Sequence, residues 1–263
     1  MRTAPGSYTL DNGWRQARHR LDLLEGCFDA GTVRRLSRLG IGPGWRCLEV
    51  GAGGGSTTRW LCGAVGPDGR VTAVDIDTRF VEGIGAPNLD VLRADVTTDE
   101  LPWSAFDLVH ARLLLVHLPT RERVLDRLVA CLRPGGCLLV EEADHYPIEA
   151  AGTGLYRDGW ISVFDAAIRR AGVDLDWARA LPMRLAEAGL ADVTCDAEVH
   201  HFEGGTPEAE FLRLTARQLR EAGLVEGAPP GQLDAWDELL RRPGRWFPGP
   251  AIVGAWGRKS ERS

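Results

Sequence analysis

Apolar residues along the chain follow two rhythms, one helical and one typical of buried strands. From Asp11 to Leu39 they recur at steps of three and four residues, as expected for one face of a helix. Beyond Gly44 they gather in short continuous runs, each bounded by glycine, proline or an acid. Strands buried on both faces of a parallel sheet have this pattern. The runs predict five strands, at Trp45–Val50, Arg70–Asp75, Leu89–Asp95, Phe106–Ala111 and Cys137–Glu142.

Helical patterns separate these strands, most clearly at Ser56–Ala64 and Arg121–Leu132. Strands and helices that alternate with short turns predict a doubly wound α/β fold, in which right-handed crossovers place helices on both faces of a parallel sheet. A ligand is then expected at the carboxyl ends of the strands. Three acids lie at or near those predicted ends: Glu49, Asp75 and Asp95.

After Glu142 the rhythm changes to longer helices, joined by two further strands. The predicted helices are Leu155–Ala171, Trp177–Ala188, Pro207–Ala222 and Gln232–Arg241. The predicted strands are Asp192–Phe202 and Ala251–Gly257.

Charge and cysteine content exclude several classes of protein. The 263-residue chain has a formal net charge of −6, whereas a nucleic-acid backbone is usually bound by a basic face, so we expect no nucleic-acid partner. Its six cysteines include no C-x-x-C pair, which argues against a disulfide framework or a zinc site. Met1–Leu10 lacks the apolar core of a signal peptide, and no apolar run approaches the ~18 residues of a membrane span. We expect a cytoplasmic protein that binds no membrane, and the sequence leaves open whether it pairs as a homodimer.

A glycine-rich loop, Gly51-Ala52-Gly53-Gly54-Gly55, directly follows the first predicted strand. Glycines at every second position let the backbone turn sharply and approach a ligand closely, because no Cβ intervenes. Ser56 or Thr57 is predicted to cap the helix that follows. The loop is related to the nicotinamide fingerprint Gly-x-Gly-x-x-Gly, but its third glycine falls one place early and Ser56 holds the dinucleotide position.

Four motifs together resemble class I S-adenosylmethionine (SAM) methyltransferases, and within them the bacterial ubiquinone/menaquinone-type group of small-molecule enzymes. They are Leu48–Gly55, Ala73–Asp77, Arg93–Val96 and Leu132–Gly136, in this order. The resemblance implies a Rossmann-like, doubly wound sheet of seven strands whose last strand is antiparallel. It also implies SAM as the cofactor. The motif Leu132–Gly136 is expected to be structural, ending a helix and turning the chain into the fifth strand.

The resemblance divides the chain into an N-terminal helical lid, residues 1–44, and a methyltransferase domain, residues 45–263. Within the domain, residues 143–180 are expected to form a small helical substrate cap. Aromatic residues in and near the cap suit an acceptor pocket, although a plain helical core fits them equally well: Tyr146, Tyr156, Trp160, Phe164 and Trp246. The N-terminal helix either closes over SAM or only packs on the sheet edge.

Most expected cofactor contacts are carried over from the family motifs. Asp75 would accept both ribose hydroxyls, and Asp95 the adenine amino group; ordinary turn or capping acids are the alternatives. The expected set is Tyr8, Glu49, Gly51, Ala52, Gly53, Gly55, Asp75, Ile76, Asp95, Val96, Ala111 and Arg112.

Methyl transfer from a sulfonium is an in-line displacement that depends on alignment and exclusion of water. An oxygen or nitrogen acceptor can also need a general base. Two histidines are candidates: His145, oriented by Asp144 or Glu142, and His117, for which a structural role in its loop is the alternative. No cluster with metal-ligand spacing is present, so we expect no metal.

We therefore expect SAM-dependent methyl transfer to a small, partly apolar or aromatic metabolite, with natural-product tailoring as one setting. One alternative is a SAM-fold protein that does not methylate, such as a cyclase, an isomerase or a binding module. Another, less favoured, is a nicotinamide oxidoreductase of the same general topology.

Overall fold

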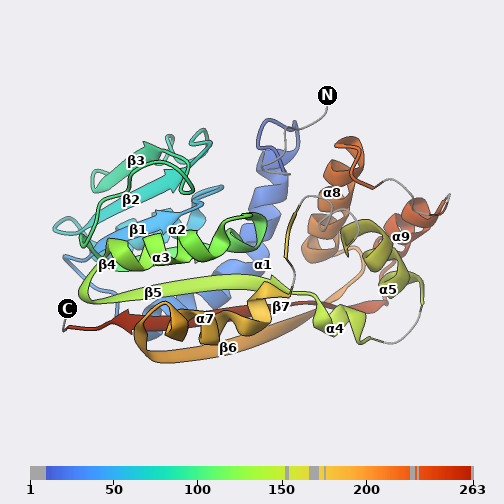
Figure 1. Ribbon diagram of the computed structural model, residues 1–263. Coiled ribbons are helices and arrows are strands. Elements are labelled where there is room, and N and C mark those ends of the chain that lie inside the picture. The colour runs from blue at the N-terminus through green and yellow to red at the C-terminus, as the bar shows by residue number, and fades with distance from the viewer. Residues whose placement is uncertain are drawn as a thin grey trace.

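A computed structural model describes residues 10–151, 154–165, 172–174, 176–225, 229 and 231–261. Within these residues a seven-stranded sheet has the order β3-β2-β1-β4-β5-β7-β6 (Figure 1). Its strands are β1 (Arg46–Val50), β2 (Arg70–Asp75), β3 (Leu89–Arg93), β4 (Phe106–Arg112), β5 (Leu132–Asp144), β6 (Leu190–Glu203) and β7 (Trp246–Lys259).

The strand directions confirm the predicted topology. Strands β1 to β5 pair in parallel, and β7 runs antiparallel between β5 and β6. Several strand boundaries differ from the prediction, and two of them concern the motifs. Strand β3 ends at Arg93, so that Asp95 lies in the turn beyond it, and Leu132–Gly136 already belongs to β5. The pairing with β4 shifts between Phe106 and Leu108, which accommodates the positive φ of +77° at Gly135.

Helices cover both faces of the sheet (Figure 1). Apolar side chains of α3 and α7 pack on one face, and those of α1 and α2 pack on the other. The helices are α1 (Ala17–Arg38), α2 (Ser56–Val65), α3 (Arg121–Cys131), α4 (Tyr146–Glu149), α5 (Leu155–Trp160), α7 (Leu181–Glu187), α8 (Pro207–Glu221) and α9 (Gln232–Leu240). Shorter turns are η1 (Leu115–His117), η2 (Ile161–Asp165) and η3 (Trp177–Ala180). None of these helices combines the length and apolarity that a membrane crossing demands.

Helices α4, α5, α8 and α9 gather beyond one end of the sheet, at the right of Figure 1. Tyr156, Trp160 and Phe164 are buried there against one another and against Trp236, with the Trp160 and Phe164 rings stacked 4.5 Å apart. These three rings therefore belong to a helical core, the alternative given above to an acceptor pocket. The predicted helix Leu155–Ala171 begins as α5 and continues as the π-helical turn η2, and its remainder lies outside the described residues.

Polar contacts fasten α1 to the sheet, because few apolar residues of this helix are buried. His110, at the centre of β4, has its Nδ1 2.6 Å from Glu49 and its Nε2 2.9 Å from Glu141, and none of its side chain is exposed. Arg35 of α1 donates to Glu141 at 2.7 Å and to Asp196 of β6 at 2.5 Å. We call Glu49, His110, Glu141, Arg35 and Asp196 the buried charge chain.

The charge state of His110 follows from its partners. Ionised carboxylates only accept hydrogen bonds, so both ring nitrogens must donate, and the imidazole is a cation. Burial alone would lower the pKa of His110, but the two carboxylates outweigh it and raise that pKa to about 9. Burial would likewise raise the pKa of Glu141, but His110 and Thr32, which donates at 2.7 Å, hold it at about 2.

Gly254 of β7 is required for the buried charge chain. A Cβ at this position would lie 2.3 Å from Nε of Arg35, so only glycine lets the arginine side chain cross β7. The guanidinium thereby reaches carboxylates on the strands to either side of β7.

Replacing His110 with Gln should lower the free energy of unfolding by about 3–5 kcal/mol, because two buried carboxylates would lose their common cation. Urea denaturation measures this loss. The matched control is Arg220→Gln, which breaks an exposed pair with Asp234 and should change stability little. Equal effects of the two substitutions would contradict the structural role of His110.

The same groups predict how stability depends on pH. The folded pKa of His110 is raised from 6.5 to about 9, so its contribution is full below pH 6.5 and lost as the pH rises to 9. The folded pKa of Glu141 is lowered from 4.5 to about 2, so its contribution is full above pH 4.5 and lost as the pH falls to 2. Burial raises the pKa of Glu142 from 4.5 to about 8, which adds to the alkaline loss. Thermal unfolding from pH 6.5 to 9 should show a falling Tm whose slope is smaller in His110→Gln; an unchanged slope would refute the assignment.

Candidate active site

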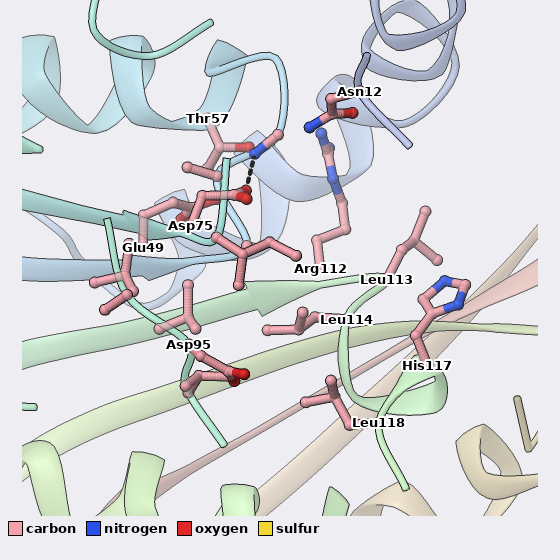
Figure 2. A pocket seen from close by; sticks show the side chains of 18 of the residues that line it. Asn12, Glu49, Thr57, Asp75, Asp95, Arg112, Leu113, Leu114, His117 and Leu118 are labelled. Carbon is pink, nitrogen blue, oxygen red and sulfur yellow. Dashed lines mark hydrogen bonds between the residues drawn. The ribbon is translucent and has the colours of Figure 1, made fainter. Parts of the chain in front are cut away.

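A cavity of about 340 Å³ opens at the carboxyl ends of β1, β2 and β4 (Figure 2). The glycine loop and the acids Glu49, Asp75 and Asp95 line one part of it. The turn after β4 and the first half of α1 line the rest, with Leu21 and Leu24 among the lining residues. This is the position that the doubly wound topology predicts for a ligand.

The glycine loop has the backbone that its sequence predicts. Gly51, Gly53 and Gly55 have φ values of +74°, +54° and +86°, in the left-handed region that favours glycine. The predicted capping by Ser56 or Thr57 is wrong, since the N-cap residue of α2 is Gly55, which has no side chain.

Helix α1 binds the outer side of this loop. Glu25 accepts a hydrogen bond from the Ser56 N–H at 3.2 Å, and Arg18 donates to the Gly54 carbonyl at 3.0 Å. A Cβ on Gly54 would lie 2.2 Å from a Glu25 carboxylate oxygen, so glycine is required here for close approach. Burial raises the pKa of Glu25.

Asp75 holds the loop from the sheet side. One carboxylate oxygen accepts the Gly53 N–H at 2.9 Å (Figure 2). The other accepts the Asp77 N–H, also at 2.9 Å. Each oxygen therefore keeps a lone pair for a ligand hydroxyl. Burial raises the pKa of Asp75 despite these bonds.

Asp95 lies lower on the same side of the cavity in Figure 2. Its Oδ1 accepts bonds from the N–H and the hydroxyl of Thr97, at 2.8 and 2.6 Å. Capping was the alternative given above for Asp95; its carboxylate here caps a turn, and the residue also lines the cavity. One carboxylate oxygen thus orders the turn while Asp95 contributes to the wall.

The opposite wall is formed by the segment after β4, where Figure 2 shows Leu113, His117 and Leu118 facing the two acids across the cavity. Burial lowers the pKa of His117 to about 4, and Arg20 and Arg121 act in the same direction. His117 is therefore neutral at neutral pH, and its imidazole can accept a hydrogen bond.

Most of the expected site residues meet at this cavity. Those lining it are Glu49, Gly51, Ala52, Gly53, Asp75, Ile76, Asp95, Val96, Arg112 and His117. Gly55 and Ala111 are not among the lining residues, because Gly55 packs against Ile84 and Val81 and Ala111 is fully buried in the sheet. Tyr8 lies outside the described residues.

His145 is not among the residues that line the cavity. Its Nδ1 accepts a hydrogen bond from the Trp160 indole at 3.3 Å, and the two rings meet edge to face. Asp144 forms a bidentate pair with Arg179, at 2.8 to 3.0 Å. Glu142 accepts backbone N–H groups of Leu114 and Leu115. The hydrogen bonds described for both carboxyl groups thus go to other residues, and the orientation of His145 by Asp144 or Glu142 stays a prediction.

Several lining residues escaped the sequence interpretation: Asn12, Leu21, Leu24, Glu25, Leu114, Leu118 and Thr120. Glu25 carried a usable signal, because it is an acid on the otherwise apolar face of the predicted N-terminal helix. The leucines carried none, since a leucine that lines a cavity and one that fills a core look alike in a sequence.

The residues present fit SAM. Gly53 approaches Asp75 through its backbone, each Asp75 oxygen retains an acceptor position for a ribose hydroxyl, and Ile76 and Val96 supply apolar surface beside them. In the part of the chain that the structure describes, no three His, Cys, Asp or Glu side chains converge as a metal site would require.

Comparisons with known proteins agree with a SAM-binding site in this cavity. A family model for a methyltransferase domain matches residues 48–138. Methyltransferase str2 of Strobilurus tenacellus is 28% identical over 251 residues, which cover 93% of this chain and 78% of that protein. The ubiquinone/menaquinone biosynthesis C-methyltransferase UbiE of Ectopseudomonas mendocina is 31% identical over 134 residues, or 46% of this chain and 52% of the relative. This chain thus spans about half the length of that relative.

Among solved structures, phosphoethanolamine N-methyltransferase 2 of Haemonchus contortus, in complex with SAM, superposes with a TM-score of 0.55 at 17% identity. The match covers 95% of this chain and 53% of that one, and it shows a shared fold. The sheet order, the glycine loop and the sequence matches all lead to one family. Together these findings support a class I SAM-dependent methyltransferase with SAM as its cofactor.

Proposed function

We infer that this methyltransferase acts on a small, partly apolar or aromatic acceptor that binds against the segment after β4. The inference rests on one observation: the same cavity is lined by the glycine loop and the acids Asp75 and Asp95 at one end and by apolar side chains of the segment after β4 at the other. When bound, SAM supplies an electrophilic methyl group on a sulfonium. Tailoring of a natural product is the setting that we expect.

The cofactor end of the cavity is proposed to work through hydrogen bonds. Asp75 would accept from the ribose hydroxyls and Asp95 from the adenine amino group, with Ile76 and Val96 beside the ring. Gly51 and Arg112 would meet the amino-acid end. All six residues line the cavity.

The acceptor end is proposed to work through shape and exclusion of water. Leu114 and Leu118 line it beside His117, and apolar walls of this kind align an acceptor without binding it through charge. We propose that His117 is the base that receives the proton of an acceptor hydroxyl, because this histidine lines the cavity and His145 does not. Neutral His117 can accept that proton in a hydrogen bond as the methyl group is transferred.

The N-terminal segment, residues 1–44, remains the proposed lid, since Asn12, Leu21 and Leu24 line the cavity. Residues 143–180 remain the proposed cap, although the described part of this segment lines no wall of the cavity. Its contact is indirect: the Asp174 N–H donates to the Val116 carbonyl at 3.1 Å, and so supports the segment after β4 from outside.

Replacing Asp75 with Ala should weaken binding of S-adenosylhomocysteine (SAH) by about 10-fold to 100-fold, because hydrogen bonds to a charged group contribute about 1.5–3 kcal/mol. Isothermal titration calorimetry measures the affinity. Asp90→Asn on β3 is the control, since Asp90 pairs with exposed Arg70 and lines no part of the cavity. Unchanged affinity in the Asp75 variant would refute the ribose assignment.

The acceptor class is tested by SAH release from SAM in the presence of phenol, catechol or hydroquinone. We expect release above the acceptor-free rate with at least one of these small hydroxyl-bearing aromatics. His117→Gln should lower that rate about 100-fold, within the range of general-base effects, and should leave SAH affinity almost unchanged. The wild-type rate should fall at low pH only as His117 protonates near pH 4. SAM binding with no release from any of the three would count against the proposed acceptor class.

A further inference from the structure

The segment after β4 follows an uncommon backbone path. Leu113 has a φ of +52°, in the left-handed region that costs a non-glycine residue about 1–3 kcal/mol. Two other described residues that are not glycine, Ser104 and Asp192, share a positive φ, but of the three only Leu113 lines the cavity. Such a conformation persists where its surroundings fix it.

Glu141 and Glu142 of β5 hold this segment, Glu141 through its backbone carbonyl and Glu142 through its side chain. The Leu113 N–H donates to the Glu141 backbone carbonyl at 2.7 Å. Oε1 of Glu142 accepts the next two N–H groups, from Leu114 at 3.2 Å and Leu115 at 2.6 Å. Consecutive backbone donors are thus taken up by consecutive residues of the neighbouring strand.

Glu142 has an unusual environment for an acid. Its side chain is fully buried, and its Oε2 has no hydrogen-bond partner among the residues described. Burial raises its pKa to about 8, so at neutral pH the neutral carboxyl predominates and its carbonyl oxygen accepts both bonds. A buried acid is costly unless its contacts compensate, and the side-chain hydrogen bonds observed for Glu142 all go to this one segment.

We propose that Glu142 is a positioning residue for the methyl acceptor, which it serves by fixing the segment Leu113–Leu118 in the cavity wall. The inference rests on the proposed function, because it assumes that the acceptor meets this wall. Glu142 itself does not line the cavity, so it acts through Leu113, Leu114 and His117. Asp75 and Asp95 belong to other elements, so the ribose and adenine contacts proposed for them should not depend on Glu142.

Two substitutions separate hydrogen bonding from packing. Glu142→Gln presents a carbonyl oxygen in the same place and mimics the neutral carboxyl group. Glu142→Leu fills a similar volume and accepts no hydrogen bond. The matched control is Asp107→Asn, at the opposite end of β4, because Asp107 also accepts a backbone N–H, from Arg46 at 2.7 Å.

The first readouts need no acceptor and use the SAH complex. In Glu142→Leu, the amides of Leu114 and Leu115 should exchange with deuterium about tenfold faster, because opening of this segment becomes easier. The pKa of His117, followed by NMR, should rise from about 4 toward 6.5. Glu142→Gln should keep both wild-type values, as should Asp107→Asn. A role in general stability alone would lower the Tm without moving the His117 pKa.

The functional readout is SAH release with the phenolic compound that the wild-type protein turns over. Glu142→Leu should lower kcat/KM for that acceptor about tenfold, a 1.4 kcal/mol effect, while SAH affinity stays at the wild-type value. Glu142→Gln should restore turnover. If Glu142→Leu does not fold, Glu142→Asp, which retracts the carboxyl group by one methylene, makes the same comparison.

Two results would overturn the proposal: wild-type amide exchange and His117 pKa in Glu142→Leu, or a loss of SAH affinity as large as the loss of turnover. Failure of the proposed function is distinguishable, because the wild-type protein would then release no SAH with any of the three compounds. In that case the exchange rates and the His117 pKa still decide whether Glu142 fixes the wall.

Discussion

The buried charge chain is the interaction on which the rest of the structure depends. A protonated His110 lies between Glu49 and Glu141, and Arg35 carries the chain from the sheet into α1. It thereby connects the neighbouring strands β1, β4 and β5 to one helix and, through Asp196, to the edge strand β6. Glu49 stands two residues before Gly51, so the same contacts that anchor the helix also fix the start of the glycine loop.

The two ends of the cavity are held by different means. At the cofactor end, backbone groups of the glycine loop and turn acids hold one another, and Asp75 bonds to Gly53 as well as to Asp77. At the other end, side chains project from one strained segment that β5 holds by its own backbone and by a single carboxyl group.

The fold could largely be predicted from the sequence, because seven apolar runs carry the seven strands and Gly51, Gly53 and Gly55 carry the loop. The placement of Asp75 and Asp95 at the cavity also followed from strand ends. The buried charge chain could not be predicted. The sequence around a histidine or glutamate in an apolar strand is the same whether its side chain is buried in an ion pair or half exposed to solvent.

Catalytic candidates were harder still to place from the sequence. His145 and His117 both follow strand ends, and only three-dimensional packing puts His117 at the cavity and His145 against Trp160. The aromatic residues of the C-terminal half pose the same difficulty. A ring that fills a core and a ring that receives a substrate have the same spacing on a helix, and only the rings that surround it distinguish the two.

The contact between Arg35 and Asp196 also constrains the order in which the protein can fold. The two residues are 161 positions apart, so α1, which leaves the ribosome early, cannot complete its docking until β6 has been synthesised. Closing so long a loop is slow, and topologies rich in such distant pairs fold slowly. Until then Arg35 has only Glu141 of its two hydrogen-bonded carboxylate partners, so the first helix is docked in full only when a late part of the chain is present.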